Sequence, residues 1–290
     1  MAGKPVLLIT RRLTDVVQAR AARDYQVILN EEDRVFSHDE LIARCQDVDA
    51  VLPCHSEHFS ADVIAALGDR LRIIANHSVG VDHVDLDAAK KAGIVVTNTP
   101  DVLSDATAEI AMLCMLGAAR YGAKGDAMVR AGKWDFWSPA FMVGRQVTGK
   151  RFGVLGMGRV GQVAADRARG FGMTVLSLHC PATAATTGII NEKTIALLPD
   201  RAILVNTARG NLVDEPALIA ALRQGKLFAA GLDVFCTEPG GNPDLAALEN
   251  VFLLPHIGSA TEETRDAMGF RALDNLDALF SGGEPQDRVA

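Results

Sequence analysis

The sequence has no C-x-x-C pair, no excess of basic residues and no long apolar run, and each absence excludes a class of protein. Its five cysteines, an odd number, are widely spaced, which argues against a zinc site or a disulfide framework and fits a reducing cytosol. The net charge of -7 argues against a nucleic-acid surface, which needs clustered basic residues. The longest apolar stretch, Glu109 to Ala119, is too short to cross a bilayer. We therefore expect a cytoplasmic protein with no membrane or nucleic-acid partner.

Short apolar runs alternate with amphipathic segments along most of the chain, which predicts β-α-β units around parallel sheets. The first run, PVLLIT, has no cleavage site after it and predicts a strand rather than a signal peptide. A length of 290 residues suggests about two domains. A long helix is predicted from Ser104 to Arg120, and the alternation resumes at Arg151. The segment AGKWDFWSPAFMVGRQVTGK, just before Arg151, holds both tryptophans and predicts an irregular connector.

One glycine-rich loop has the spacing of a nucleotide-binding site. Gly156, Gly158 and Gly161 form a G-x-G-x-x-G pattern that follows an apolar strand and opens a predicted helix. Glycines permit a tight turn and close approach to a pyrophosphate, and the helix N-terminus supplies backbone N–H groups. The alternative is a close strand–helix crossing without a ligand. The context favours dinucleotide binding.

The same pattern normally has an acidic residue about 20 positions further on, which holds the ribose hydroxyls. Counting from Gly156 leads to Leu176, within MTVLSLHCP, a stretch that contains no Asp, Glu or Arg. The phosphate end of the site is therefore present in the sequence, and the ribose end is missing.

Three polar residues follow predicted strands: Arg209 after ILVNTA, Glu238 after GLDVFCT, and His256 after VFLLP. Chemistry in open parallel sheets collects beyond the carboxyl ends of the strands. A guanidinium can pair with a substrate carboxylate, an imidazole can donate a proton to a developing alkoxide, and a carboxylate can orient that imidazole. The simpler interpretations are a surface ion pair, turn chemistry and a capping histidine. Their joint position behind a dinucleotide loop favours the functional set.

With these residues in place, the sequence resembles the D-isomer-specific 2-hydroxyacid dehydrogenases. The stretches that look like this family's motifs are GVLGMGRVG, LSLHCPAT, ILVNTARGNLVDEPALIAAL, AAGLDVFCTEP, LLPHIGSAT and NHSVGVDHVDLDAAKKAGIVVTNTP. The resemblance implies an α/β fold of two Rossmann-like parallel-sheet domains. A flavodoxin-like substrate domain would comprise residues 1–99 and 264–290, a dinucleotide-binding domain residues 100–263, and a catalytic cleft would lie between them.

The resemblance also implies roles for residues of this chain. Arg209, Glu238 and His256 match the family's catalytic residues. Substrate contacts are implied for Ser78, Val79, Gly80, Arg209 and Trp137. Cofactor contacts are implied for Gly156, Met157, Gly158, Arg159, Val160, Gly161, Thr107, His179, Cys180, Pro181, Thr186, Thr207, Ala208 and Asp233. No metal site is implied.

The connector and the strand after it look most like the glyoxylate/hydroxypyruvate reductase branch of the family. This branch implies NADP slightly in preference to NAD. The family implies a homodimer, with the helix after Ser104 and the aromatic connector at the interface. Trp137, with Trp134 close behind, is the candidate to reach the partner's active site, and ordinary interface packing is the alternative for both.

The chain departs from the family at one place. The strand that begins GMTV normally ends in the ribose contact, and a helix and another strand follow before LSLHCP. Here Val175 runs directly into Leu176, so a strand–helix–strand segment of about 30 residues is absent. Either the natural protein contains a mobile segment that this chain omits, which we favour, or the segment is deleted. A deletion would fuse two strands, expose a sheet edge and remove the adenosine pocket.

The function expected from the sequence is NAD(P)H-dependent reduction of a small 2-keto acid, with glyoxylate or hydroxypyruvate favoured and His256 as acid–base. One alternative is a dehydrogenase for another acid, such as phosphoglycerate, lactate or a sugar acid. The other is a nucleotide-sensing, corepressor-like interaction protein on the same fold.

Overall fold

The computed structural model describes residues 3–172 and 174–290 and divides the chain into two compact units. The first unit combines Met1–Val102 with Ala260–Ala290, and the second is Leu103–Ser259. Each unit is built on one parallel five-stranded sheet, so the predicted two-domain α/β fold is confirmed. The assignment of one unit to substrate and the other to nucleotide stays a prediction.

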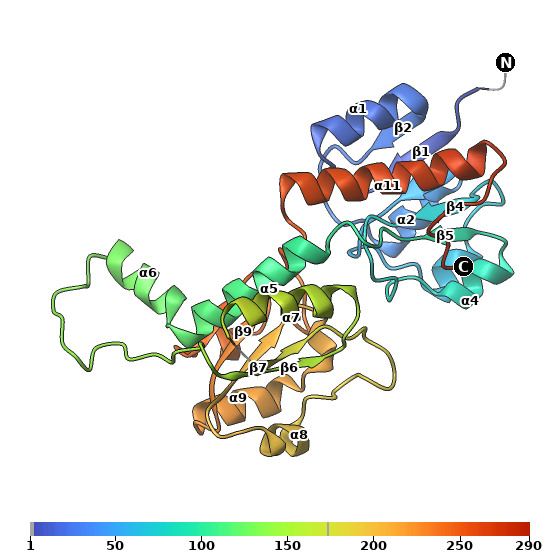
Figure 1. The fold of residues 1–290 in the computed structure, drawn as a ribbon. Helices are drawn as coiled ribbons and strands as arrows, with labels where there is room; N and C mark the ends of the chain where they lie inside the picture. Colours follow the sequence, from blue (N-terminus) through green and yellow to red (C-terminus); the bar gives the residue numbers. More distant parts are fainter. Residues whose placement is uncertain (1–2, 173) are drawn as a thin grey trace. The chain divides into compact units, whose positions relative to one another are not determined.

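The sheet of the first unit has the strand order β2-β1-β3-β4-β5, the flavodoxin-like order expected for it (Figure 1). Its elements are β1 (Val6–Ile9), α1 (Asp15–Asp24), β2 (Gln26–Leu29), α2 (His38–Cys45), β3 (Ala50–Leu52), α3 (Ala61–Ala65), β4 (Ile73–Ala75), α4 (Leu86–Lys91), β5 (Val95–Thr97) and α11 (Glu262–Phe280).

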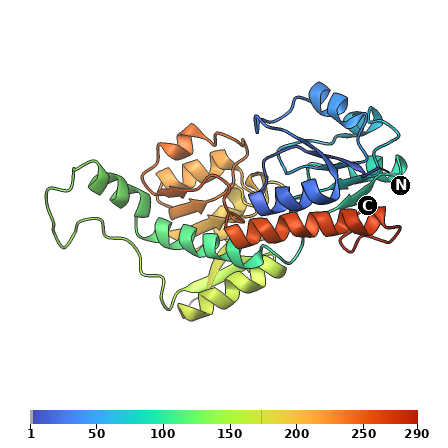
Figure 2. The ribbon, with the colours of Figure 1, turned by 90° about the horizontal axis from the view of Figure 1, so that it is seen from above.

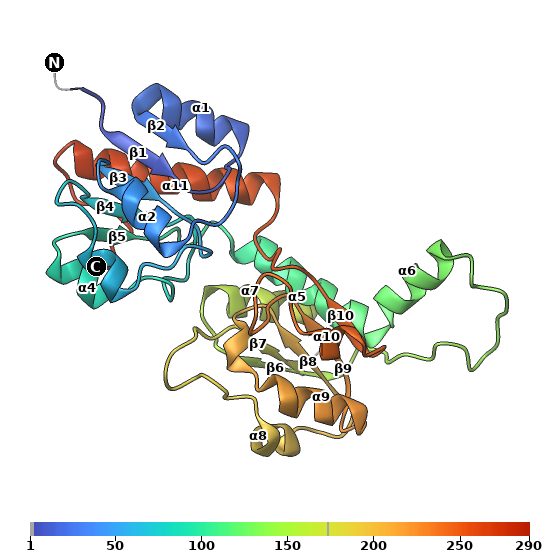
Figure 3. The same ribbon diagram turned by 180° about the vertical axis from the view of Figure 1, so that it is seen from behind.

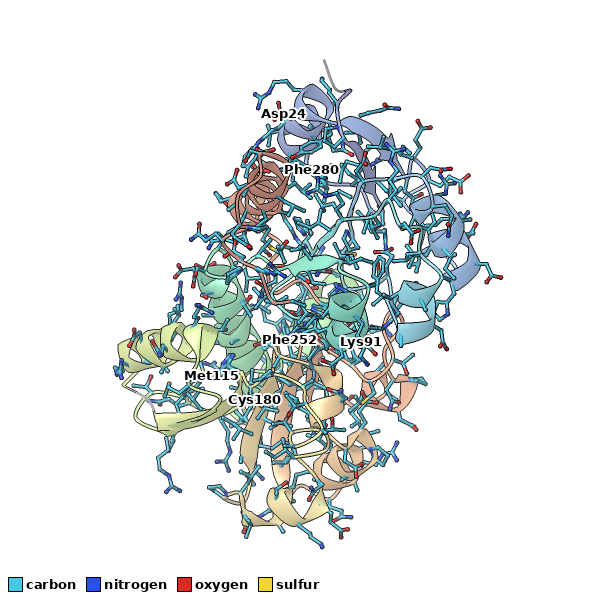
Figure 4. All side chains as sticks on the ribbon, turned by 90° about the vertical axis from the view of Figure 1, so that its right-hand side faces the viewer. Asp24, Lys91, Met115, Cys180, Phe252 and Phe280 are labelled. Atoms are coloured by element: carbon cyan, nitrogen blue, oxygen red, sulfur yellow. The ribbon has the colours of Figure 1, made fainter. Side chains whose placement is uncertain are left out.

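Alternating side chains of β1 bury both faces of this sheet. Leu8 packs into a core on one face, while Leu7 and Ile9 pack on the other with residues of α1 and α11. Figure 2 shows α1 and α11 lying side by side although they come from opposite ends of the chain. Phe280, labelled in Figure 4, stacks edge-on against Tyr25 with ring centroids 6.1 Å apart. The C-terminal helix thus completes the first unit.

The second unit has the strand order β10-β9-β8-β7-β6. Its elements are α5 (Ser104–Ala119), α6 (Gly122–Arg130), β6 (Arg151–Leu155), α7 (Arg159–Gly170), β7 (Thr174–Leu178), α8 (Glu192–Leu197), β8 (Ala202–Asn206), the 3-10 turn η1 (Gly210–Leu212), α9 (Glu215–Arg223), β9 (Leu227–Leu232), α10 (Pro243–Ala246) and β10 (Val251–Leu253).

Helices cover both faces of this second sheet. Figure 3 shows α5 and α7 on one side of the strands and α8 and α9 on the other. Neighbouring residues of β8 confirm the two faces, because Val205 packs with α5 and α7 whereas Leu204 packs with α8, α9 and α10. The sheet therefore lies between two helical layers, and the loops that follow its strands carry the polar residues predicted for the site.

Polar caps explain where several helices begin. Ser37 and Glu40 form a capping box at the start of α2, and Ser60, predicted as a cap, accepts a hydrogen bond from Val63 N. Asp85 and Asp214 cap α4 and α9 in the same way. These side chains satisfy backbone N–H groups that the first helical turn leaves unpaired.

One helix of the second unit differs from the sequence-based expectations. Residues 122–130, for which no element is predicted, form α6 before the irregular connector. As expected where Val175 runs directly into Leu176, the two segments that meet there share one strand, β7, which ends at Leu178; Met173 lies outside the described residues. In the described part of the chain, no helix combines the length and apolar character that a membrane span requires.

A histidine buried in the first unit makes its stability depend on pH. His77 is 6% exposed, and its Nε2 lies 3.3 Å from the backbone oxygen of Arg265. Burial, together with the positive charge of Arg265, lowers the pKa of His77 to about 4. The unfolded chain binds a proton near the ordinary pKa of about 6.5, so acidification from 6.5 toward 4 favours unfolding.

We expect the free energy of unfolding to fall by about 2 kcal/mol between pH 7 and pH 5 because of this one group. In His77→Asn, which cannot take up the proton, that part of the decrease should disappear. Urea unfolding of both proteins at the two pH values, followed by circular dichroism, measures the difference. An equal loss of stability in the variant and the parent would contradict the assignment.

Candidate active site

The loop between β6 and α7 brings two of its three glycines, Gly156 and Gly161, into close contact with neighbouring backbone. Gly156 has φ +97°, and a Cβ there would lie 2.3 Å from the backbone nitrogen of Cys180. A Cβ at Gly161 would lie 2.1 Å from the backbone oxygen of Gly156. Gly158 occupies the N-cap of α7 without a capping side chain. A helix N-terminus without a capping side chain suits an anion.

The loop after β7 lies against this glycine turn. Because Gly156 meets the backbone of Cys180, the predicted cofactor residues His179 and Cys180 border the same turn. The hydroxyl of Thr186 donates to the backbone oxygen of Pro181 at 2.7 Å and closes the following loop. Burial lowers the pKa of His179 to about 4, which keeps the imidazole neutral near pH 7.

Glu238 and His256 form a hydrogen-bonded pair at the ends of β9 and β10. His256 Nδ1 lies 2.6 Å from Glu238 Oε2, and the two side chains are 27% and 25% exposed. Glu238 Oε1 accepts a hydrogen bond from the backbone N–H of Phe235 at 2.8 Å. His256 has φ +54°, a left-handed backbone that is uncommon outside glycine. The carboxylate therefore holds the imidazole ring through Nδ1.

The loop that carries Arg209 packs against the loop that leads to Glu238. A Cβ at Gly210 would lie 1.9 Å from the backbone carbon of Phe235, so glycine is needed for this contact. Asn206, buried at the end of β8, donates to the backbone oxygen of Arg209 at 2.8 Å and accepts from Ala208 N at 3.1 Å. Sequence reasoning missed Asn206 and Gly210, although both stand within VNTARG, beside the predicted arginine.

Two buried polar atoms at the same sheet edge have no hydrogen-bond partner among the described residues. They are Thr207 Oγ1 and Asp233 Oδ2. The other oxygen of Asp233 accepts from Ile257 N at 2.8 Å, and burial raises the pKa of this carboxyl. A Cβ at Gly258 would meet Asp233 Oδ2 at 3.2 Å and Thr107 Cγ2 at 3.4 Å. The structure thus brings Thr107 and Asp233 together, as two of the predicted cofactor residues.

Ser78, Val79 and Gly80 belong to the first unit, where they follow β4. Ser78 donates to the backbone oxygen of Gly80 at 2.7 Å, and Asn98 donates to that of Val79 at 2.9 Å. The amides of Val79 and Gly80 make no hydrogen bond to another described residue, which suits an anionic group. Trp137 instead is 74% exposed on the connector that follows α6. Figure 1 shows this connector as the long loop beyond α6.

Comparison with known proteins identifies the family. The family model described as "D-isomer specific 2-hydroxyacid dehydrogenase, catalytic domain" matches residues 7–290. The chain belongs to the D-isomer-specific 2-hydroxyacid dehydrogenases. These are NAD(P)-dependent oxidoreductases, so the predicted enzyme class is confirmed.

Two curated members of the family and one solved structure show how far the likeness extends. The chain is 39% identical to the glycerate dehydrogenase of Hyphomicrobium methylovorum, over 97% of this chain and 98% of that one. It is also 39% identical to the glyoxylate reductase of Pyrococcus furiosus, over 99% and 95% of the two chains. The structure of an NAD-binding D-isomer specific 2-hydroxyacid dehydrogenase homologue from Polaromonas superposes with a TM-score of 0.93 at 38% identity and covers all of both chains.

The described residues fit a nicotinamide dinucleotide at two of its parts. The glycine turn and the N-terminus of α7 suit the pyrophosphate. The unsatisfied atoms of Thr207 and Asp233 suit the polar carboxamide of a nicotinamide, because buried polar groups require partners. For the adenosine ribose, the stretch MTVLSLHCP that follows α7 offers neither an acidic residue nor an arginine.

Substitutions in the glycine loop can test nucleotide binding separately from the stability of the fold. A Cβ added at Gly158 meets no atom within 4 Å, whereas one at Gly161 collides with the backbone. We expect Gly158→Ala to lower the free energy of unfolding by no more than about 1 kcal/mol, the loss of a favourable N-cap, while it weakens nucleotide binding about tenfold. Calorimetric titration and urea unfolding measure the two effects.

Gly161→Ala is the matched control and should lower both stability and binding, because its methyl group cannot be accommodated. Unchanged nucleotide affinity in Gly158→Ala would show that the turn does not approach the pyrophosphate.

Proposed function

We propose that this chain reduces a small 2-keto acid, glyoxylate or hydroxypyruvate, to the D-2-hydroxy acid with a reduced nicotinamide dinucleotide. The observation that carries the proposal is the 2.6 Å contact between His256 Nδ1 and Glu238 Oε2, at the same sheet edge as the glycine turn. The curated glycerate dehydrogenase and glyoxylate reductase among its relatives support this substrate class.

In the proposed mechanism, Arg209 pairs with the substrate carboxylate and carbonyl oxygen through its fork of N–H donors. His256 donates a proton from Nε2 to the carbonyl oxygen, and Glu238 holds the ring through Nδ1. The bound reduced nicotinamide supplies the hydride that completes the alcohol. The amides of Val79 and Gly80 and the side chain of Ser78 are proposed to take part in binding the carboxylate.

The direct test is loss of the absorbance of the reduced nicotinamide with glyoxylate or hydroxypyruvate, run in parallel with NADH and NADPH. The branch that the sequence resembles favours NADP slightly, and this preference stays a prediction, as does a cytoplasmic location. Turnover with neither acid and neither nucleotide would refute the proposed function.

Substitution of His256 tests its proposed acid–base role. Asparagine is the better replacement, because it tolerates a left-handed backbone more readily than most residues. We expect His256→Asn to lower kcat by about 100- to 10,000-fold, because the proton donor is removed, while nucleotide affinity changes by less than about threefold. Steady-state kinetics and calorimetry measure these quantities.

Glu238→Gln serves as the graded control. It keeps a hydrogen-bond acceptor beside Nδ1 but removes the negative charge, so we expect a smaller loss of kcat, about 10- to 100-fold. Turnover within tenfold of the parent in His256→Asn would exclude this histidine as the acid.

We also propose that the chain forms a homodimer through the connector and α5. The connector exposes Trp134, Phe136, Trp137 and Val143, whose exposed fractions are 58%, 58%, 74% and 63%. Leu113 of α5 is also 45% exposed. Apolar side chains gathered in this way are typical of an association surface. Contact of Trp137 with the partner's active site is part of this proposal.

The dimer is tested by removing the largest exposed side chain of the connector. We expect Trp137→Ser to shift the protein from twice its chain mass of 30.9 kDa toward the monomer mass in sedimentation, because a buried aromatic anchors such interfaces. Val16→Ser, which removes a 52% exposed side chain of α1, should leave the mass unchanged. A monomeric parent protein would contradict the proposal.

A further inference from the structure

The sheet of the second unit contains a crossover of unusual hand. Its order, β10-β9-β8-β7-β6, means that each new strand along the chain is added on the same side of the previous one. All the strands are parallel, so every connection is a crossover. Since such crossovers are right-handed in about 98% of cases, the connecting helices of this series should all lie on one face.

They do not all lie on one face. Ile195 of α8, Leu218 of α9 and Leu245 of α10 pack with Leu204 on one side of the sheet. Ala164 and Ala168 of α7 pack with Val205, the next residue of β8, on the opposite side. Three crossovers therefore share one hand, and β6–α7–β7 has the other. The common hand is the right-handed one, which makes the crossover through α7 left-handed.

A right-handed crossover with α7 in its observed place would put the next strand on the other flank of β6. That flank is unpaired, because β7 is the only described strand that pairs with β6. Partial exposure agrees with a missing neighbour: no residue of β6 is fully buried, whereas every residue of β9 is buried. The sheet thus has an open position beside the strand that leads into the glycine turn.

The relatives contain additional residues that could form a strand at this position. Their alignments run over 315 and 321 positions but cover 97% and 99% of this chain, about 281 and 287 residues, so about 34 positions in each have no residue of this chain. An excess of this size corresponds to one strand–helix–strand step of about 30 residues.

We infer that the free edge of β6 is the docking site for one further parallel strand, supplied by a strand–helix–strand step between Val175 and Leu176 that this chain lacks. With the step in place, α7 crosses over in the right-handed sense and the GMTV and LSLHCP segments occupy separate strands. One consequence rests on the proposed function: without the step, the chain binds only the nicotinamide and pyrophosphate parts, and it does not distinguish NADH from NADPH.

A graft tests the inference. The corresponding segment of the Hyphomicrobium methylovorum glycerate dehydrogenase is inserted between Val175 and Leu176, and a Gly/Ser linker of equal length at the same place is the control. We expect the graft to raise Tm by at least about 5 °C over both the parent and the linker variant. The ratio of the NADH and NADPH dissociation constants should lie within about threefold in the parent and exceed about tenfold in the graft.

A linker variant that gains as much stability as the graft, or a graft with unchanged or lowered Tm, would overturn the docking site. If the dissociation constants of NADH and NADPH differed tenfold or more in the parent chain, the inference that this chain lacks the ribose contact would be wrong. Failure of the proposed function looks different: the graft then gains stability while neither nucleotide binds.

Discussion

Parallel pairing from β6 to β10 brings the carboxyl ends of five strands to one edge, and the chemistry of the second unit depends on this constraint. The glycine turn, Arg209, Glu238 and His256 each follow a different strand. Residues far apart in the sequence therefore meet without a long loop. A helical or antiparallel arrangement would send alternate loops to opposite ends and separate the same residues.

Glycines let the loops at this edge of the sheet pack with their backbones in direct contact. Gly156 allows the turn after β6 to meet Cys180, and Gly210 allows the Arg209 loop to meet Phe235. Phe235 in turn donates its N–H to Glu238, which holds His256. The position of the imidazole thus depends on the close packing of these loops, and such packing is how a rigid scaffold fixes the orientation of a side chain.

Sequence patterns predicted much of this arrangement because their physics is local. The G-x-G-x-x-G spacing and the apolar alternation predicted the strand–turn–helix of β6 and α7 and both parallel sheets. They missed α6, because its residues carry no buried face to produce a periodic pattern. The return of α11 to the first sheet was also invisible to periodicity, since its partners in β1 and α1 lie some 250 residues away.

By itself, the sequence determined the family, the two-sheet fold and the set of residues at the strand ends, because each depends on short motifs or on local periodicity. It also showed that the stretch MTVLSLHCP after α7 carries no Asp, Glu or Arg that could contact a ribose. Only the tertiary structure decided that Glu238 contacts His256, that Asn206 and Gly210 shape the Arg209 loop, and that β6 has an open flank. The hand of a crossover depends on which face of the sheet a helix covers, and that choice is made by packing between segments distant in sequence.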